Sequence, residues 1–501
     1  MRVGRLLNSV MSLLLLVALI GCRVGPEYSP PDAPFSEAWS LAAPPDIGLG
    51  QAVDDEWWNS FGDPVLSGLI ERVRIQNFSL QEAEARIAES RFQFAIARGG
   101  LFPEVFQIDS YTNRKFGLNG TQFGTFPFPS SPFDVWMYGL DAAWELDVAG
   151  KQKRTVEAAD ADFAASVARR DDLLVRLFGE VARTYVELRT AQERMVVAEE
   201  NVRLQRATLR LTEDRMRAGA VGPLDVAQAK TQLSQTEAAV PDLFNQAKLA
   251  ENRLCVLQGE PPRSLESQLQ GTRSIPQPPA QIGLGMPIDL LRRRPDVRRA
   301  EREVAAQCAA IGIAEADLYP QLSLAGTFAP IANNFSAVFD WSSLYYSVGP
   351  SVRWNILNFG RVRSNIAAQQ ARWDQAVAKY RQTVIQAGEE VESALSTLIR
   401  ERERERHLAV AVAAAGDAVQ FAQMQYREGA VGFQSVLDSE RVLVQVQDQH
   451  VATRGRVAGA AILLFKTLGG GWELEGIEIL PTQLPSTLVS PIEPLPAPLA
   501  P

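Results

Sequence analysis

A seven-residue repeat of apolar side chains constrains the fold of this chain more than any other feature. One apolar side chain recurs at every seventh position in the series Val167, Leu174, Val181, Leu188, Met195, Val202, Leu209 and Met216. A strict seven-residue step keeps one seam facing a partner helix and imposes a left-handed supercoil. The stretch from Lys151 to about Met216 contains no proline, and at ~1.5 Å per residue it predicts a helix of roughly 100 Å. A rod of this length is far longer than a helix of a globular core.

The rod ends at a glycine-rich turn and occurs a second time. The first turn is Gly219, Ala220, Val221 and Gly222, and a return helix is expected to about Leu257. The same spacing recurs at a constant offset. The second turn is Gly429, Ala430, Val431 and Gly432. The second seam has one polar break, Glu405, and its apolar members are Val377, Val384, Val391, Leu398, Val412, Val419 and Tyr426. Further upstream, a slightly larger offset superposes Pro103 on Pro320. The chain is therefore an internal duplication whose first copy has a longer segment after Pro103.

Between each rod and the helix before it, the apolar period changes from helical to two. The first copy alternates through Trp136, Tyr138, Leu140, Ala142, Trp144 and Leu146, and the second through Leu344, Tyr346, Val348, Val352, Trp354 and Ile356. Each strand is expected to pair with an earlier one, near 104–114 and 320–330. Such strands, apolar on one face with aromatics near the ends, are typical of transmembrane β-barrels. One hairpin alone would fit a soluble sheet equally well, but two matched hairpins joined to such long helices leave no soluble core to cover them.

Four strands cannot close a barrel, and open sheet edges are not tolerated in lipid. The chain is therefore expected to oligomerise. Two copies would supply about eight strands and three about twelve, and this arithmetic does not choose between them.

The chain begins with a secretory signal rather than with folded structure. Arg2 and Arg5 precede an apolar block that ends in Leu-Ile-Gly before Cys22. This block resembles the lipobox of bacterial lipoproteins, in which Cys22 becomes the acylated first residue; an ordinary signal peptide with a chance cysteine is the alternative. Acyl chains would anchor the mature N-terminus to a membrane leaflet. Arg23, in place of an inner-membrane retention aspartate, favours the outer membrane.

Bulk composition argues against several classes of function. The net charge of −9, without a basic stripe, argues against a nucleic-acid partner. His407 and His450 have no cysteine or carboxylate cluster at ligand spacing, and Cys255 and Cys308 are expected to be small buried residues. The sequence therefore predicts no catalytic residues, no metal and no cofactor, and the protein is not expected to be an enzyme.

Several motifs, taken in order, resemble the outer membrane factors of the TolC kind, in particular the lipoprotein branch with NodT-like and OprM-like efflux channels. These motifs are Cys22-Arg-Val-Gly-Pro-Glu-Tyr28, Trp57-Trp58 with Phe61-Gly-Asp-Pro64, the paired Gly-Ala-Val-Gly turns, Leu437-Asp438, and Leu468-Gly-Gly-Gly-Trp472. With the duplication they cover nearly the whole mature chain. The resemblance implies a fold of mixed α and transmembrane β structure, a trimer whose twelve-stranded barrel continues into a periplasmic α-helical tunnel.

The resemblance also assigns roles at the two turns. In the family the turns form the periplasmic tips that meet a membrane fusion (adaptor) protein, which implies that role for residues 219–222 and 429–432. Tyr426 matches a tyrosine that holds the gate shut, with a hydrogen bond expected across the closed tip. Asp438 matches one of the aspartates that ring the aperture, although an ordinary surface carboxylate is the alternative. Ser435 stands where some members have another aspartate, which puts strong cation selectivity in doubt.

The predicted function is a passive exit duct in the outer membrane. Small molecules such as drugs would be delivered by an inner-membrane pump, of the resistance-nodulation-division type, through the adaptor. Two alternatives stay open, namely the same duct serving protein or peptide secretion and a non-conducting lipoprotein tether. The predicted organisation is a signal peptide at 1–21, a lipid-anchored linker at 22–56, a first repeat at 57–271 (hairpin 103–147, rods 151–257), a second repeat at 272–471 (hairpin 320–357, rods 361–468) and a proline-rich tail at 472–501.

Overall fold

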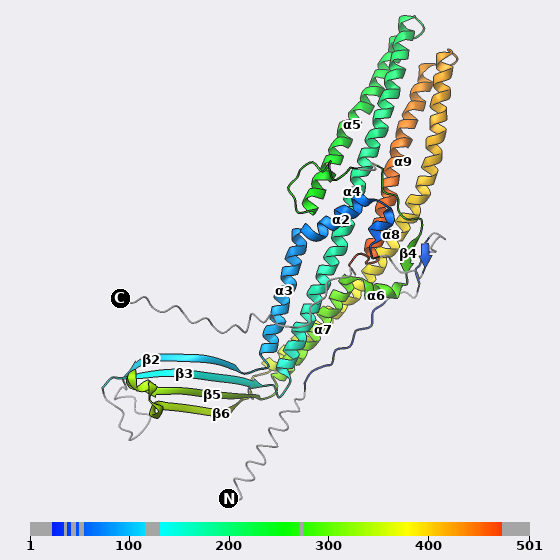
Figure 1. Cartoon of the computed structure of the whole chain (residues 1–501). Coiled ribbons are helices and arrows are strands. Elements are labelled where there is room, and N and C mark those ends of the chain that lie inside the picture. The colour runs from blue at the N-terminus through cyan, green and yellow to red at the C-terminus, as the bar shows by residue number, and fades with distance from the viewer. Residues whose placement is uncertain are drawn as a thin grey trace, which may run out of the picture.

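Two long helical hairpins and a four-stranded sheet lie at opposite ends of an elongated molecule (Figure 1). The computed structural model of the chain describes residues 23–34, 38–41, 47–49, 55–115, 131–270 and 274–472. The predicted signal peptide, Cys22 and the tail from residue 473 lie outside the described residues. The predicted mixture of long helices and a few strands is confirmed.

The long helices are the two predicted rods and their return helices. α4 spans Lys151–Arg217 and α8 spans Arg361–Arg427, with 67 residues each. α5 spans Pro223–Leu257 and α9 spans Phe433–Thr467, with 35 residues each. Both pairs keep the offset that relates the two glycine turns, as the duplication requires. At ~1.5 Å per residue, α4 and α8 are each about 100 Å long.

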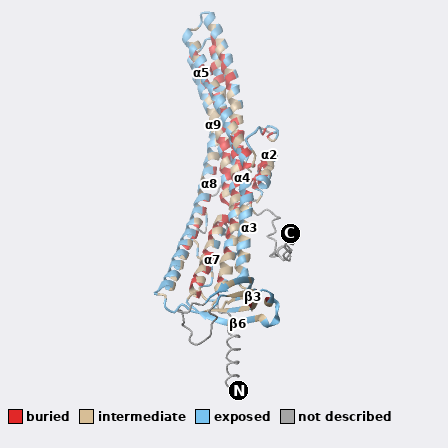
Figure 2. Ribbon diagram, turned by 90° about the vertical axis from the view of Figure 1, so that its left-hand side faces the viewer, coloured by how far each residue is buried: buried red, intermediate tan, exposed pale blue. Residues whose placement is uncertain are grey.

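The heptad seam is buried along most of α8 and over about half of its positions in α4. The buried members are Leu174, Val181, Leu188 and Val202 in α4, and Val377, Val384, Val391, Leu398, Val419 and Tyr426 in α8. These side chains lie on the stripe of each rod that faces a partner helix, and the seven-residue step keeps that stripe facing the partner along the rod. The seam is exposed at the first tip, where Met216 is 36% accessible. Away from the seam α8 is largely exposed, whereas α4 is buried on several sides (Figure 2).

A second pair of matched helices leads into the sheet. α3 (Phe78–Gly99) and α7 (Pro295–Ala316) have 22 residues each and keep the larger offset that relates Pro103 to Pro320. The Asn77 side chain accepts hydrogen bonds from the backbone N–H groups of Ser79 and Leu80, at 2.8 and 3.2 Å. These bonds satisfy donors that the first turn of a helix leaves unpaired, and they fix the start of α3.

The duplication extends to single hydrogen bonds where helix meets strand. The Trp144 indole donates to the Leu101 carbonyl, and the Trp354 indole donates to the Leu318 carbonyl, each at 3.0 Å. The two carbonyls keep the larger offset of the upstream helices, whereas the two indoles keep the smaller offset of the rods. The difference in length between the copies therefore lies inside the strand hairpins.

One antiparallel sheet combines strands from both copies. Its strands, in spatial order, are β2 (Glu104–Arg114), β3 (Phe133–Leu146), β5 (Gln321–Ala332) and β6 (Leu344–Arg353). The central β3–β5 pair joins the two copies, with Leu146 opposite Leu322. β2 and β6 are the edges, and each has one side without a partner strand among the described residues. β6 ends before Trp354 and Ile356, which the period-two pattern had included in the strand.

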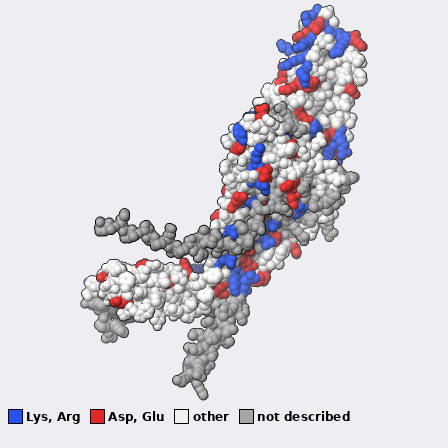
Figure 3. Space-filling model, in the orientation of Figure 1, with Lys and Arg blue, Asp and Glu red and all other residues white. Residues whose placement is uncertain are grey.

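The two faces of the sheet differ in character. Leu140, Phe328 and Tyr346 form one apolar row across three strands and are 51%, 52% and 72% accessible. The neighbouring row, on the opposite face, is Asp141, Thr327 and Ser347, and the Thr327 hydroxyl donates to the Asp141 carboxylate at 2.8 Å. Few charged side chains appear on the visible side of the sheet, whereas the helical body carries both signs throughout (Figure 3). This alternation is typical of a sheet with lipid on one side and water on the other.

A second, small sheet joins the predicted linker to the beginning of the predicted second repeat. β1 (Ile47–Leu49) pairs in parallel with β4 (Ile282–Gly285). Three residues are too few to produce a periodic pattern, so the extended-linker prediction for 22–56 missed this pairing. The remaining described elements are short: η1 (Trp57–Phe61), α2 (Pro64–Gln76), η2 (Pro287–Asp289), α6 (Leu290–Arg293), η3 (Ser336–Phe339) and η4 (Trp341–Ser343).

The tryptophan motif that carries part of the family resemblance has a packing role. The Trp57 ring stacks on Phe465 of α9 with centroids 5.4 Å apart, and Trp58 meets Phe178 of α4 edge-on at 5.1 Å. These four side chains are buried and hold η1 and α2 against the middle of the rods. The motif therefore positions the helical body and is not a ligand site.

Candidate functional site

Both rods end in the same hydrogen-bonded turn. Gly219 has a φ of 73°, and its N–H donates to the Met216 carbonyl at 2.9 Å, while the Ala220 N–H donates to the Arg215 carbonyl at 2.9 Å. The second turn repeats both bonds at the equivalent positions, with a φ of 76° at Gly429. This arrangement is a Schellman motif, which places a left-handed residue after the helix and favours glycine there.

The second glycine of each turn has no such requirement. Gly222 has φ −91° and ψ 166°, and Gly432 has φ −76° and ψ 163°, which any residue can adopt. A Cβ added at either position would meet no atom within 4 Å. Each glycine is the N-cap of a return helix and offers no side-chain cap, where serine or asparagine would be stronger. A positive φ therefore accounts for glycine at residues 219 and 429, but not at residues 222 and 432.

The turns present backbone and small side chains to solvent. Gly219, Ala220 and Gly222 are exposed, and so are their equivalents Gly429, Ala430 and Gly432. Val221 and Val431 instead pack inward against the tip core, which consists of Ala229, Ala422, Tyr426, Phe433, Val436 and Leu437. Of the eight residues predicted to contact an adaptor, the two valines therefore mainly stabilise the tip, and the other six form its outer surface.

Tyr426 lies at the centre of the tip core. It is 1% accessible, and its ring meets Phe433 edge-on at 5.8 Å. Arg215, from the first hairpin, lies over the ring at 4.3 Å and donates to the Tyr426 backbone carbonyl. Tyr426 and Arg215 therefore connect the two hairpins of one protomer. The Tyr426 hydroxyl is buried and has no hydrogen-bond partner among the described residues, so within one protomer the tyrosine connects the hairpins through its ring and its backbone carbonyl. A hydroxyl hydrogen bond across the closed tip stays a prediction.

Ser435 and Asp438 lie on the exposed side of α9, apart from Tyr426. The Gln434 amide donates to the two Asp438 oxygens at 2.9 and 3.0 Å, and the Arg441 guanidinium is 3.9 Å away. The Asp438 side chain remains 59% accessible. The structure thus separates the three predicted gate residues into one buried aromatic and two solvent-facing polar groups.

Sequence reasoning missed a buried carboxylate just above the tip core. Glu440 is 3% accessible and accepts hydrogen bonds from the Thr208 hydroxyl at 2.6 Å and the Gln423 amide at 3.1 Å. These neutral partners come from α4 and α8, so the cluster joins three helices. Burial raises the pKa of Glu440, and the two hydrogen bonds oppose that shift. The spacing from Phe433 and Leu437, seven and three residues earlier, was the available signal, because it places Glu440 on the buried stripe of α9.

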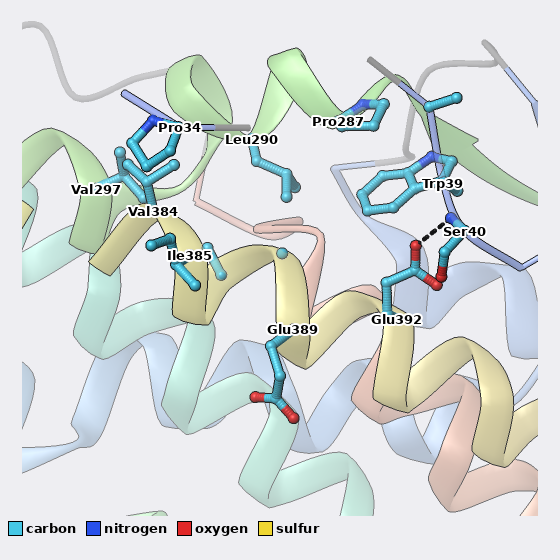
Figure 4. Close-up of a pocket in the computed structure, with 13 residues that line it drawn as sticks. Pro34, Trp39, Ser40, Pro287, Leu290, Val297, Val384, Ile385, Glu389 and Glu392 are labelled. Carbon is cyan, nitrogen blue, oxygen red and sulfur yellow. Dashed lines mark hydrogen bonds between the residues drawn. The ribbon is translucent and has the colours of Figure 1, made fainter. Parts of the chain in front are cut away.

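A cavity of about 560 Å³ lies where the N-terminal segment crosses α8 (Figure 4). Trp39, Pro287 and Ile385 line it with apolar surface. The Ser40 N–H donates to the Glu392 carboxylate at 2.6 Å and closes one side. None of the predicted tip or gate residues lines this cavity.

The predictions on metal binding, on the two cysteines and on lipidation bear on the chemistry of the chain. Within the described residues, no group of three or more His, Cys, Asp and Glu side chains is placed to hold a metal ion. Cys255 and Cys308 are free and buried. Cys22 precedes the first described residue, so its lipidation stays a prediction. None of the described helices combines the length and the apolarity needed to cross a bilayer.

An accessible apolar sheet face, a polar opposite face and long helical hairpins with small-residue tips are typical of one class of protein, the outer-membrane channels. A sequence model of the outer membrane efflux protein family matches residues 69–260 and 286–470, one stretch in each copy of the duplication. The chain belongs to this outer membrane efflux protein family.

Similar proteins cover almost the whole chain. Nodulation protein T of Rhizobium leguminosarum bv. trifolii is 30% identical over 473 residues, which are 94% of this chain and 98% of that protein. The pyoverdine export outer membrane protein OpmQ of Pseudomonas putida is 30% identical over 436 residues, 86% of this chain and 91% of that protein. A solved structure of the outer-membrane channel OprN matches with a TM-score of 0.83 and 34% identity, over 90% of this chain and 100% of that one. These matches place the protein in the outer membrane, extending into the periplasm, and its family and fold neighbours are channel proteins.

Proposed function

We propose that the protein is the outer-membrane channel of a tripartite efflux system, a passive duct for small molecules supplied by an inner-membrane pump and a periplasmic adaptor. The observation that carries the proposal is the open sheet. β2 and β6 each have an unpartnered edge in the described chain, and the sheet exposes an apolar row on one face and a polar row on the other. In lipid both edges must pair, which three copies would achieve in a twelve-stranded barrel with the polar rows inside.

The helical body supports the same assembly. α8 lies at the edge of the protomer with most of its surface exposed (Figure 2). On α3, Phe92 and Ile96 are 52% and 75% accessible and lie one helical turn apart. In a closed ring the exposed side of α8 would cover α3 of the next copy, and the rods would continue the barrel as a tunnel.

The assembly is tested by mass and conductance. Native mass measurement of the full chain in detergent should give a trimer, and the trimer should form ion-conducting pores in planar bilayers. A stable monomer that retains bilayer-inserted β structure would contradict the closure argument, and a trimer without conductance would favour the non-conducting lipoprotein tether.

Adaptor docking is proposed for the exposed tip surface. Gly222 and Gly432 support it because neither backbone geometry nor packing within the protomer explains a glycine at these positions. Replacing both by serine should improve the helix caps while adding side chains to the docking surface. We expect trimer yield to be retained and adaptor binding to fall severalfold in a pull-down or cross-linking assay. Gly416→Ser, in α8 with open space around it, is the matched control and should leave adaptor binding unchanged.

Lipidation is proposed from the Leu-Ile-Gly-Cys block at the end of the signal peptide. Cys22→Ser should abolish incorporation of labelled palmitate into the mature protein. Undiminished labelling would remove the lipoprotein proposal and leave the barrel as the membrane attachment.

Small-molecule export is favoured over protein secretion by the relatives, one of which is named for pyoverdine export and another for antibiotic efflux. Deletion of this protein should increase intracellular accumulation of the exported compounds, and complementation should restore their efflux. The neighbouring genes discriminate further, because a resistance-nodulation-division pump beside an adaptor supports efflux and an ABC transporter supports protein secretion.

A further inference from the structure

The described chain begins in a slot between α4 and α7. Arg154, on the first turn of α4, has no accessible surface. Its guanidinium donates to the carbonyls of Val24 at 2.9 Å and Gly25 at 3.0 Å. It also pairs with Glu157 at 2.8 Å and Glu27 at 3.3 Å. A buried guanidinium is costly unless its donors are satisfied, and here backbone carbonyls of the N-terminal segment satisfy two of them.

Three glycines allow the segment to enter this slot. Gly25 has a φ of 91°, and a Cβ there would lie 2.4 Å from the Cα of Gly312 on α7. A Cβ on Gly312 would lie 2.7 Å from the Arg154 Nε, and one on Gly150 would lie 2.7 Å from the Cα of Arg23. Any larger side chain at these places would push the segment out, so the slot fits one chain path closely.

The segment stays attached beyond the slot. The Tyr28 hydroxyl donates to Glu301 of α7 at 3.2 Å, and the Arg381 guanidinium of α8 donates to the Asp32 carbonyl at 3.2 Å. The Ser40–Glu392 bond described above continues this series along α8. In Figure 1 the segment is the dark-blue trace that leaves the helix–sheet junction and follows the helical body toward β1.

The slot is located at the rim of the sheet. The Val24 N–H donates to the carbonyl of Ala149 at 3.1 Å, and Ala149 lies in the short connection between the end of β3 and the start of α4. Cys22 precedes Val24 by two residues, and two extended residues span at most about 7 Å. The length of the chain alone therefore keeps any group attached to Cys22 within about that distance of Val24.

We propose that the slot is a binding site for the chain's own N-terminal segment, with Arg154 as its positioning residue, and that it holds an acylated Cys22 at the sheet rim. Acyl chains and strands would then enter the same membrane leaflet at a fixed separation. A simple tether would not need a buried arginine, because any linker of sufficient length would suffice. The positioning role rests on the proposed lipidation and barrel, whereas occupation of the slot does not.

Occupation of the slot is tested on full-length protein without acylation. The Cys22→Ser chain, secreted behind a non-lipoprotein signal, is analysed by hydrogen exchange of the peptide covering residues 23–34. We expect protection in the parent, lost in Arg154→Met and in Gly25→Ala and retained in the controls Lys153→Met and Ser29→Ala. Gly25 belongs to the segment itself, so this second variant leaves the helical body unaltered. Exchange in the parent as fast as in an unstructured peptide, or protection that survives both variants, would overturn the slot.

Positioning is tested on the acylated protein. A ten-residue Gly/Ser insertion between Cys22 and Arg23 leaves the slot intact but lets the lipid move by roughly 18 Å. The same insertion after Leu41, beyond the slot, leaves the lipid in place and serves as the control. We expect Arg154→Met and the first insertion to reduce the yield of membrane-inserted oligomer severalfold, and the control insertion to leave it unchanged. Equal yields from Arg154→Met, the first insertion and the control insertion would show that the slot packs the N-terminal segment without positioning the lipid. Absence of palmitate from the parent would refute the proposed lipidation, and with it the positioning role, while the exchange result still decides whether the slot is occupied.

Discussion

The two copies place different side chains at equivalent positions of one backbone. Tyr426 of the second tip is 1% accessible, whereas its equivalent in the first tip, Met216, is 36% accessible. Glu440 is buried in the second hairpin, and the equivalent Lys230 is exposed in the first. The helix lengths and the turn hydrogen bonds are nevertheless the same in both. Helix bounds therefore follow from the duplicated sequence pattern, but burial follows from what each helix packs against.

The difference bears on the proposed gate. The Arg215 side chain extends from the first hairpin over the Tyr426 ring, so this contact between the hairpins uses the buried aromatic side chain of the second tip. The acidic residues near the start of the return helices also occupy different positions in the two hairpins. Asp225 of the first hairpin is equivalent to Ser435 of the second, and Gln228 is equivalent to Asp438. In the proposed duct, the first hairpin would therefore act as the supporting partner, and the second would carry the groups whose release opens the end of the duct.

The largest expected effect comes from emptying the second tip core. Tyr426→Ala removes a buried ring and should lower the stability of the tip by about 3–5 kcal/mol, whereas Met216→Ala should cost less than about 1 kcal/mol. Hydrogen exchange of the 418–438 region measures the stability, and planar bilayers should show raised resting conductance for Tyr426→Ala alone.

The ring-preserving variant sharpens this test. Tyr426→Phe removes a hydroxyl without a partner among the described residues and should leave resting conductance unchanged. If Phe opened the duct as much as Ala does, the hydroxyl would have to bond across the protomer boundary, and the packing account would be wrong.

The next effect separates the two glycines of one turn. Gly219→Ala forces a non-glycine residue into the left-handed region and should destabilise the first hairpin by roughly 1–2 kcal/mol. Gly222→Ser has an ordinary φ and supplies a capping hydroxyl, so it should not destabilise the hairpin. Thermal unfolding and exchange at the tip measure both variants. Equal losses would mean that the turn geometry does not explain the first glycine.

Periodic features of the chain were predictable from the sequence, whereas contacts between distant residues were not. The two rods and the offset between them were predicted because every seventh residue of each rod is apolar and lies on the same seam. The tip cap followed from glycine at residues 219 and 429. The β1–β4 pairing, the Arg215–Tyr426 contact and the Arg154 slot each join residues far apart in the chain without a periodic signal. Glu440 was detectable in principle, as a carboxylate on an apolar stripe, because helix periodicity alone places it there.

A pH series tests whether the buried carboxylate of the second hairpin matters. The pKa of Glu440 is raised above its ordinary value by burial, so its contribution to stability is fully present at low pH and is lost as the pH rises through the folded-state pKa. Glu440→Gln keeps an acceptor for Thr208 and should remove this loss, so the variant should be more stable than the parent at neutral pH. Melting temperatures between pH 4 and 8 measure the effect, with the exposed Asp438→Asn as the control. Parallel curves for parent and Glu440→Gln would contradict the burial argument.

The smallest effect on stability is expected from Asp438 itself. Its carboxylate is 59% accessible and has only helix-surface partners, so Asp438→Asn should change stability by less than about 0.5 kcal/mol. If its symmetry copies face one axis, the same variant should weaken cation preference and cation block in planar bilayers without altering trimer yield. Unchanged selectivity would identify Asp438 as an ordinary surface carboxylate.

The equal length of α4 and α8, 67 residues each, has a further consequence for symmetry. Two turns per chain in a proposed trimer would make a ring of six hairpin ends with nearly the same backbone but two alternating sets of side chains. The barrel end and the tip end would share a threefold axis, while the tips alone would approximate a sixfold arrangement. A ring of six identical adaptor subunits would then meet two kinds of site in alternation. Every second subunit would contact the hairpin that holds Tyr426, and its neighbours would contact the hairpin that supports it.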